Sequence, residues 1–202
     1  MKLSILIPTH NRPELFYRCI TSVLNNIPKN VQVIVNNDSQ DIQEIIHPQI
    51  QYHYKQFEHL SGVYQFLLSK ADGEYIYYVE DDDYLVNDFY SFIMPSLNYD
   101  IIGGNYYPAW NHNWIIKCAS SMNKEFKLND DIFQLGQFIM KKQLANQFTF
   151  PLDSCIHNDY KLVSYVLSLS KSQINIPKVF YYQTTDGGDN ISFPESSNYY
   201  GV

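Results

Sequence analysis

The 202-residue sequence lacks the features that mark several common classes of protein. It has only 14 Lys and Arg against 21 Asp and Glu, and the basic residues are scattered, which argues against a nucleic-acid partner. Its three cysteines form no CxxC pair, so neither a disulfide framework nor a zinc site is predicted. No apolar run is long enough for a transmembrane segment. What remains is an acidic, aromatic-rich chain whose length suits one globular domain.

Apolar runs of strand length alternate with helical patterns in the first half of the chain. The run Leu3–Pro8 is followed by Asn11 as a candidate helix N-cap and by Pro13, which favours the first turn of a helix. Further buried strands are predicted at "VQVIV", residues 31–35, and "YIYYV", residues 75–79. This alternation predicts an α/β fold with a mostly parallel central sheet flanked by helices.

Polar residues follow three of the predicted strands. In parallel sheets ligands bind beyond the carboxyl ends of the strands, so segments 9–12, 36–38 and 80–83 are expected on one rim. The second half of the chain reads differently, with strand candidates such as residues 100–107, a helix near residues 158–170 and a last strand at "VFYYQ", residues 179–183.

Four consecutive carboxylates, Glu80, Asp81, Asp82 and Asp83, end the third of these strands. An EF-hand is excluded, because Val86 stands where that loop needs glycine. One interpretation is a solvated acidic turn. The other is a site for Mg²⁺ or Mn²⁺, which bind one or two carboxylates together with water and a substrate's phosphates.

Three segments resemble an inverting family 2 glycosyltransferase of the GT-A fold. "SILIPTHNR" is similar to that family's opening "SIIIPTYNR", and "ADGEYIYYVEDDDYL" is similar to its "AKGEYIxFLDxDD". The later "NDYKLVSYVLSLSKSQINIPKVFYYQTTDGGDNIS" resembles the closing "EDYDLWLRLxKxGxIxYIPEVLYYYRxHxxxxS". The resemblance implies a single GT-A domain over residues 1–202. Residues 1–99 would form its nucleotide-sugar-binding half and residues 100–202 its acceptor-binding and catalytic half.

The resemblance also implies roles for individual residues. Asp82 matches the metal ligand, with Glu80 as a further ligand, and Asp83 lies next to it on the reaction side. Asp159 matches the catalytic base that takes the proton of the acceptor hydroxyl. The residues expected around the nucleotide are Pro8, Thr9, Asn11, Arg12, Asn37, Asp38, Gln65, Glu80 and Asp81.

Three positions depart from the family pattern. Asn37 stands where an aspartate usually reads the base, and its amide oxygen is expected to accept the N3 hydrogen of uracil. Gln65 stands where the family usually has asparagine. Asp186 lies in the stretch that replaces a late histidine, where it would supply an oxygen ligand or nothing.

Some residues have structural alternatives. Asp159 precedes an apolar-periodic segment, so it equally suits the start of a helix, where a carboxylate stabilises exposed amides. Arg12 is expected either to reach a phosphate or to be an exposed turn residue.

Three functions remain open at this point. The leading hypothesis is transfer of a sugar from a nucleotide-diphosphate sugar, with a UDP-sugar favoured, to a glycan, glycoprotein or lipid-linked acceptor, using Mn²⁺ or Mg²⁺. A sugar-1-phosphate nucleotidyltransferase would need a glycine-rich loop after the first strand, and "PTHNRPE" has none. A non-catalytic nucleotide or sugar-binding module is the third. The expected location is the cytoplasm, with a membrane surface or a host cytoplasm as alternatives.

Overall fold

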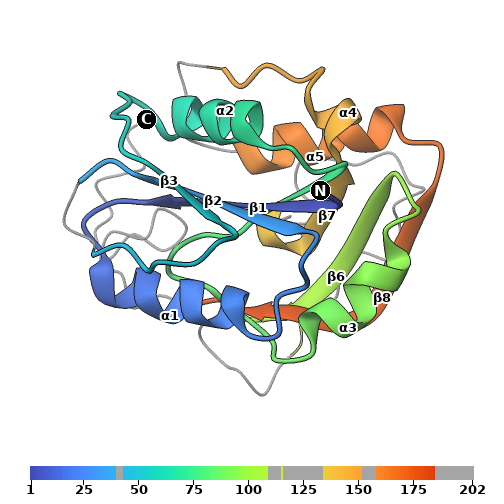
Figure 1. Cartoon of the computed structure of the whole chain (residues 1–202). Helices are drawn as coiled ribbons and strands as arrows, with labels where there is room; N and C mark the ends of the chain where they lie inside the picture. Colours follow the sequence, from blue (N-terminus) through green and yellow to red (C-terminus); the bar gives the residue numbers. More distant parts are fainter. Residues whose placement is uncertain (40–42, 109–114, 116–133, 152–157, 185–202) are drawn as a thin grey trace.

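The computed structural model describes residues 1–39, 43–108, 115, 134–151 and 158–184. A mixed sheet with the strand order β3-β2-β1-β4-β7-β6-β8-β5 runs through the molecule (Figure 1). Its strands are β1 (Leu3–Thr9), β2 (Val31–Asn37), β3 (Ile50–His53), β4 (Tyr75–Tyr78), β5 (Tyr84–Leu85), β6 (Ile101–Tyr107), β7 (Phe138–Lys141) and β8 (Gln173–Tyr182).

Helices lie on both faces of the sheet, with α1 on one side and α2 and α5 on the other (Figure 1). They are α1 (Pro13–Leu24), α2 (Leu60–Lys70), α3 (Phe89–Ile93), α4 (Lys142–Ala145) and α5 (Asn158–Leu169), with the 3₁₀ turns η1 (Met94–Ser96) and η2 (Leu135–Gln137). The predicted α/β architecture is therefore confirmed.

The first half of the sheet is parallel, as the alternation of strands and helices predicts. β3, β2, β1 and β4 pair in parallel, while β7 is antiparallel to both of its neighbours, β4 and β6. Because every residue of β1 and β2 is buried, these strands read as continuous apolar runs rather than alternating ones. Their carboxyl ends lie side by side, with Pro8 opposite Asn36 and Thr9 opposite Asn37.

Two hydrophobic cores hold the helices against the sheet. Phe16, Cys19, Ile20 and Val23 of α1 recur at helical spacing and pack on one face. On the other face, side chains of α2 pack with Leu162, Val163, Val166 and Leu167 of α5.

Two local predictions are wrong. Asn11 does not cap α1: Arg12 holds the N-cap position without a side-chain cap bond, and Asn11 adopts a left-handed conformation with φ of 51°. The last strand begins at Gln173, well before the predicted "VFYYQ", and includes Pro177. Proline is disfavoured inside strands because it donates no ladder hydrogen bond, so it hid the first half of β8.

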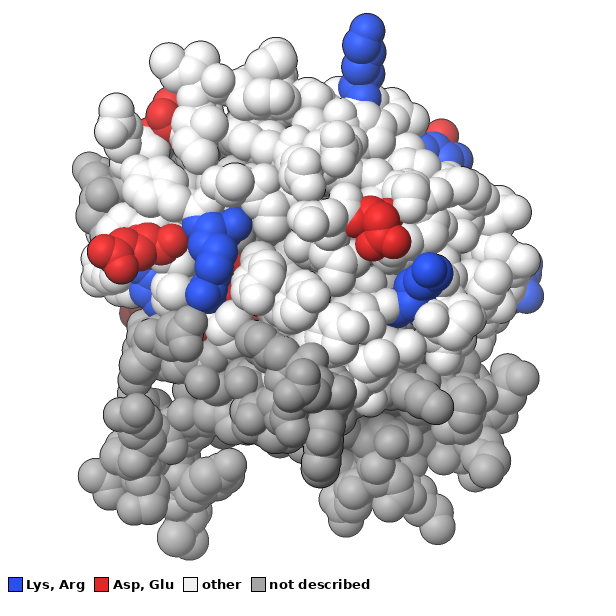
Figure 2. All heavy atoms as spheres, turned by 90° about the horizontal axis from the view of Figure 1, so that it is seen from below, with Lys and Arg blue, Asp and Glu red and all other residues white. Residues whose placement is uncertain are grey.

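Charged side chains are scattered over the surface seen in Figure 2, on the α1 side of the molecule. Lys and Arg form no continuous patch among the described residues visible there. Within the described ranges, no helix has the length and apolarity required to cross a bilayer.

Candidate active site at the end of the parallel strands

The turn that follows β4 carries four carboxylates into a largely buried position. Asp81 is fully buried, and Asp82 and Asp83 are only 6% and 7% exposed. The interpretation as a solvated acidic turn is therefore wrong. Two unit charges about 4 Å apart repel by roughly 4 kcal/mol at the effective dielectric near a protein surface, so burying several carboxylates requires counter-charges.

Arg12 supplies one of these counter-charges. Its Nη2 lies 2.5 Å from Oδ1 of Asp81, and its Nη1 lies 3.2 Å from Oδ2 of Asp82. The Arg12 side chain is 19% exposed, which contradicts its reading as an exposed turn residue. A planar guanidinium is suited to such two-point contacts with carboxylates.

Arg18 and Thr184 fix the main chain of the same turn. Arg18 Nη2 and Thr184 Oγ1 each donate to the main-chain oxygen of Asp82, at 2.8 and 2.5 Å, and Arg18 also donates to Thr184 Oγ1. The Arg18 guanidinium lies over the ring of Tyr84, which adds a cation–π contact. The turn is thus tied both to α1 and to the residues that leave β8. The sequence analysis singled out neither Arg18 nor Thr184.

Asp83 is held by the same segment. Its Oδ1 accepts a hydrogen bond from the main-chain N–H of Thr184, at 3.1 Å. Burial raises the pKa of Asp83 well above its usual range, and the charge of Asp82 raises it further, whereas the Thr184 bond lowers it. This contact gives Asp83 a structural role, and no contact tests its predicted catalytic role.

Tyr64 of α2 is a second residue that sequence reasoning missed. Its hydroxyl donates to Oε1 of Glu80 at 2.5 Å, whereas the neighbouring Gln65, which was expected at the site, accepts the N–H of Phe150. Burial raises the pKa of Glu80 to about 8, although the Tyr64 bond lowers it. Burial likewise raises the pKa of Asp81 to about 7 against the lowering effect of Arg12. These carboxyls therefore lose their protons near neutral pH.

Asn37, at the end of β2, presents a donor rather than the expected acceptor. Its Oδ1 accepts hydrogen bonds from the main-chain N–H and the hydroxyl of Ser39, at 3.2 and 2.8 Å. A main-chain N–H can only donate, so this contact fixes which end of the amide faces Ser39. The fully buried Nδ2 has no hydrogen-bond partner in the part of the chain that the structure describes. The expectation that Asn37 accepts the N3 hydrogen of uracil is therefore corrected.

The neighbouring residues at this rim also contact one another. Asp38 Oδ1 lies 2.5 Å from Nδ1 of His10, and the Asp38 N–H bonds to the main-chain oxygen of Thr9. The N–H of Asn11 donates to Ser39 Oγ at 3.0 Å. The ends of β1 and β2 are thereby joined, as predicted for neighbouring parallel strands.

Two of the predicted residues lie where the structure describes no side chain. Asp159 is the second residue of α5, and only its helical backbone is described. Asp186 lies outside the described residues. Thr184, two positions before it, contacts Asp82 and Asp83, so the chain reaches the acidic turn there.

The acidic turn has the oxygen donors that a divalent cation prefers. Within the described ranges, no three His, Cys, Asp or Glu side chains are placed to hold a metal together. Mg²⁺ and Mn²⁺ bound with a phosphate substrate need only one or two carboxylates, however. Among the described residues, Oδ2 of the fully buried Asp81 has no hydrogen-bond partner, which leaves an oxygen for a cation. Asp82 and Asp81 thus fit this mode of binding.

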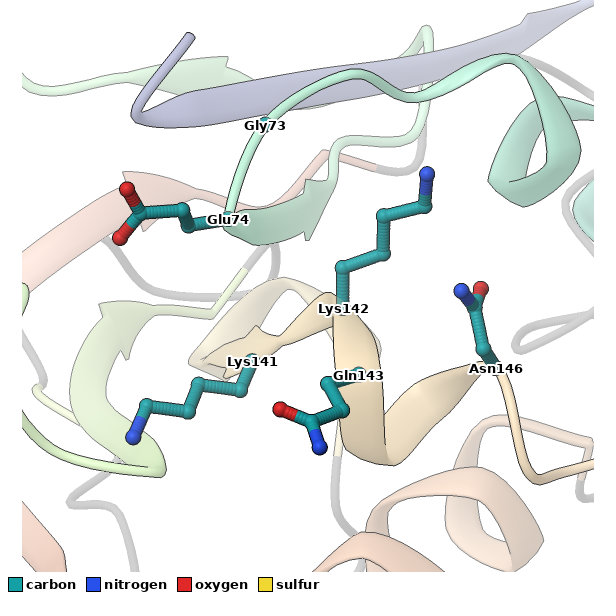
Figure 3. Close-up of a pocket in the computed structure, with 6 residues that line it drawn as sticks. All are labelled: Gly73, Glu74, Lys141, Lys142, Gln143 and Asn146. Atoms are coloured by element: carbon teal, nitrogen blue, oxygen red, sulfur yellow. The ribbon is translucent and has the colours of Figure 1, made fainter.

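A pocket of about 440 Å³ lies at the opposite end of the sheet (Figure 3). Gly73 and Glu74, just before β4, line it together with Lys141, Lys142 and others. The Glu74 and Lys141 side chains both extend toward the left of the view in Figure 3. None of the residues predicted for the site lines this pocket.

A parallel half-sheet with polar residues beyond the carboxyl ends of its strands is the arrangement in which open α/β sheets bind their ligands. The model of the family "Glycosyl transferase family 2" matches residues 4–142, and the chain belongs to this family. The resemblance given by the sequence motifs is thereby confirmed.

Relatives with known names or structures agree with this assignment. The chain is 30% identical over 175 residues to a GalNAc(5)-diNAcBac-PP-undecaprenol beta-1,3-glucosyltransferase of Campylobacter jejuni, covering 78% of this chain and 53% of the relative. The structure of Staphylococcus aureus TarS 1–349 with UDP-GlcNAc is similar with a TM-score of 0.74 at 18% identity, covering 95% of this chain and 61% of that one. The structure of a Pyrobaculum calidifontis mannosyltransferase with GDP-Man and Mn²⁺ is similar with a TM-score of 0.64 at 12% identity, covering 93% of this chain and 58% of that one.

These similarities establish the GT-A fold. The chain spans roughly half to three-fifths of the length of each of these relatives.

Proposed function

We propose that the protein is an inverting, metal-dependent glycosyltransferase that moves a sugar from a nucleotide-diphosphate sugar to an acceptor hydroxyl. The observation that carries this proposal is the buried turn Glu80–Asp83, held by Arg12 and Arg18 beside the ends of β1 and β2. A fold that binds nucleotide sugars in its solved neighbours supports it.

A UDP-sugar is the favoured donor. Pro8 and Thr9 would line the base, with Asn37 and Asp38 reading its edge. The buried Nδ2 of Asn37 would donate to a base oxygen or ring nitrogen, while the carboxylate of Asp38 would accept a base hydrogen. The TarS structures with UDP-GlcNAc and UDP favour uracil, although another neighbour holds GDP-Man.

Asp82 would hold Mn²⁺ or Mg²⁺ with help from Asp81, and Glu80 and Asp186 are further candidate ligands. When bound, the cation supplies Lewis-acid neutralisation of the departing diphosphate. The chain's own part is to present carboxylates in a buried and tightly tied turn, which limits rearrangement on binding.

The chemical step is a single displacement. The acceptor oxygen bonds to the anomeric carbon while the bond from that carbon to the diphosphate oxygen breaks, and Asp159 takes the hydroxyl proton. The resemblance of the segment that begins at Asn158 to the family's closing motif supports Asp159 in this role. Asp83, next to Asp82, would help to form the side of the site where the reaction takes place. Gln65 would contribute to donor binding only indirectly. In this proposal residues 1–99 bind the donor and residues 100–202 complete the site.

The acceptor is proposed to be a glycan, glycoprotein or lipid-linked sugar in a surface-glycan pathway. The undecaprenol-linked substrate in the name of the Campylobacter relative favours the lipid-linked form. A cytoplasmic location, including a membrane surface, suits a nucleotide-sugar donor.

The test is release of UDP from a panel of UDP-hexoses in the presence of Mn²⁺. We expect release with at least one donor, loss of release in EDTA, and loss in Asp159→Asn with retained UDP binding. Tight nucleotide binding without release from any donor would instead favour a non-catalytic binding module. Metal-independent turnover would contradict the mechanism.

A further inference from the structure

Arg12 contacts one oxygen of Asp81 and one oxygen of Asp82, the two carboxylates proposed to hold the cation. We propose that Arg12 is an internal counter-ion, which closes the acidic turn in the free protein and must leave Asp82 when a divalent cation and a diphosphate bind. This inference rests on the proposed function, because it assigns Arg12 a regulatory place in the same site.

The contacts of the guanidinium support this role. One arm lies 2.5 Å from Oδ1 of Asp81 and the other 3.2 Å from Oδ2 of Asp82, and both carboxylates are buried. Among the described residues, Asp81 keeps a second oxygen, Oδ2, that is buried without a partner. A single guanidinium therefore engages two carboxylates while this oxygen of Asp81 stays unsatisfied, which is the state expected of a site that still has a ligand to bind.

A cation on Asp82 and the guanidinium on the same oxygen are mutually exclusive. Two positive charges at contact distance repel, and each competes for the same lone pairs. A guanidinium pairs with phosphate as well as with carboxylate, so a bound diphosphate offers Arg12 a second partner nearby. Metal and nucleotide binding should consequently be coupled through Arg12.

The local backbone allows such an exchange. Arg12 stands at the N-cap of α1, outside the helix proper, with φ and ψ of −132° and 58° and no side-chain cap bond. Asn11 before it has a positive φ. The Arg12 side chain can therefore change partners without unwinding α1. Arg18, by contrast, lies within the helix and donates to main-chain oxygen.

The test compares Arg12→Gln with the wild type in binding of Mn²⁺ alone, by calorimetry or by paramagnetic resonance of free Mn²⁺. Energetic coupling between sites commonly amounts to 5–150-fold. We expect Mn²⁺ to bind Arg12→Gln at least about tenfold more tightly than the wild type, and UDP to increase Mn²⁺ affinity less in the variant. Arg12→Lys should lie between the two, because it keeps the charge but loses the two-point contact.

Arg18→Gln is the matched control, since it removes the same charge from the same turn. Arg18→Gln should raise the affinity for Mn²⁺ less than about threefold, because Arg18 would repel the cation only through a weaker, longer-range charge effect. A melting measurement completes the design: Arg12→Gln should melt below the wild type in EDTA and recover with Mn²⁺.

The outcomes separate the two proposals. Equal or weaker Mn²⁺ binding by both Arg12 variants would overturn the counter-ion role, even if the wild type binds and cleaves UDP-sugars. A wild type that binds neither Mn²⁺ nor UDP would instead overturn the proposed function. Should Arg12→Gln fail to fold in EDTA, Arg12→Lys still decides, because the counter-ion role requires it to bind Mn²⁺ more tightly than the wild type.

Discussion

The two ends of the same half-sheet carry charged pairs of opposite character. At the carboxyl end, Arg12 is paired with two buried carboxylates, and among the described residues a carboxylate oxygen and an amide nitrogen have no partner. At the other end, Lys2 pairs with Glu74 at 2.6 Å and Lys141 with Asp100 at 2.7 Å, and the Lys2, Glu74 and Lys141 side chains are more exposed than that of Arg12.

The difference teaches where function resides in this fold. Buried polar atoms without partners cost free energy, so a sequence retains them where a ligand completes them. Exposed ion pairs, in which each charge has its partner, need no ligand and contribute little to the stability of the fold. The predictions below set one end of the sheet against the other.

The largest effect is expected on catalysis. Asp82→Asn should lower kcat/KM for UDP release at least about 100-fold, because it removes a charge that would bind the cation opposite the developing diphosphate charge. Lys142→Gln, in the pocket of Figure 3, should change it less than about twofold. Similar losses in both variants, or full activity in Asp82→Asn, would contradict the assignment of the site to the carboxyl end.

The second prediction concerns the pH dependence of stability in EDTA. The pKa values of Glu80 and Asp81 are raised to about 8 and about 7, so the folded protein binds these protons more tightly than the unfolded chain. Stability should therefore fall by several kcal/mol as the pH rises from about 5 to 8.5. Denaturant unfolding at several pH values measures this slope.

Mn²⁺ supplies the control for the pH prediction. A bound cation favours the ionised carboxylates, so the slope should flatten when Mn²⁺ replaces EDTA. A flat profile in EDTA would mean that these carboxyls titrate normally in the folded protein, and a slope of opposite sign would mean that folding lowers their pKa values.

The sequence predicts the parallel half of the fold and the position of the site, but not the partners of the carboxylates. Buried parallel strands are recognisable in the sequence as apolar runs. Because the carboxyl ends of such strands lie at the same edge of the sheet, the sequence predicts that Thr9, Asn37 and Asp82 lie near one another. The contacts of Tyr64, Arg18 and Thr184 with that rim depend on packing between segments far apart in sequence, for which no spacing signal exists.

The sequence also did not predict how Asn37 is oriented. Whether its amide presents a donor or an acceptor to a base depends on Ser39, whose N–H donates to the amide oxygen. The burial of Asp81, Asp82 and Asp83 is accompanied by contacts from Arg12 and from Arg18 of α1, which composition does not reveal.

The third prediction concerns choice of the base. Asn37→Asp replaces the buried donor by an acceptor, which suits the N3 hydrogen of uracil and repels the N3 lone pair of cytosine. The ratio of UDP to CDP affinity, measured by calorimetry with Mn²⁺, should rise about tenfold. Ser39→Ala is the control, because the main-chain N–H still orients Asn37 and the ratio should not change. An unchanged ratio in Asn37→Asp would exclude Asn37 from base recognition.

The smallest effect is expected for Lys141→Gln, which removes one charge at the far end as Arg12→Gln does at the rim. Asp100 would keep its hydrogen bonds from the N–H groups of Lys171 and Ser172, and the Lys141 side chain is 37% exposed. The melting temperature should therefore change by less than about 2 °C. The melting temperature of Arg12→Gln in EDTA should fall several times more than that of Lys141→Gln, since this substitution leaves two buried carboxylates without their counter-ion. The main physical difference between these two pairs is their exposure. Equal decreases in melting temperature in the two variants would therefore show that burial does not distinguish the two ends of the sheet.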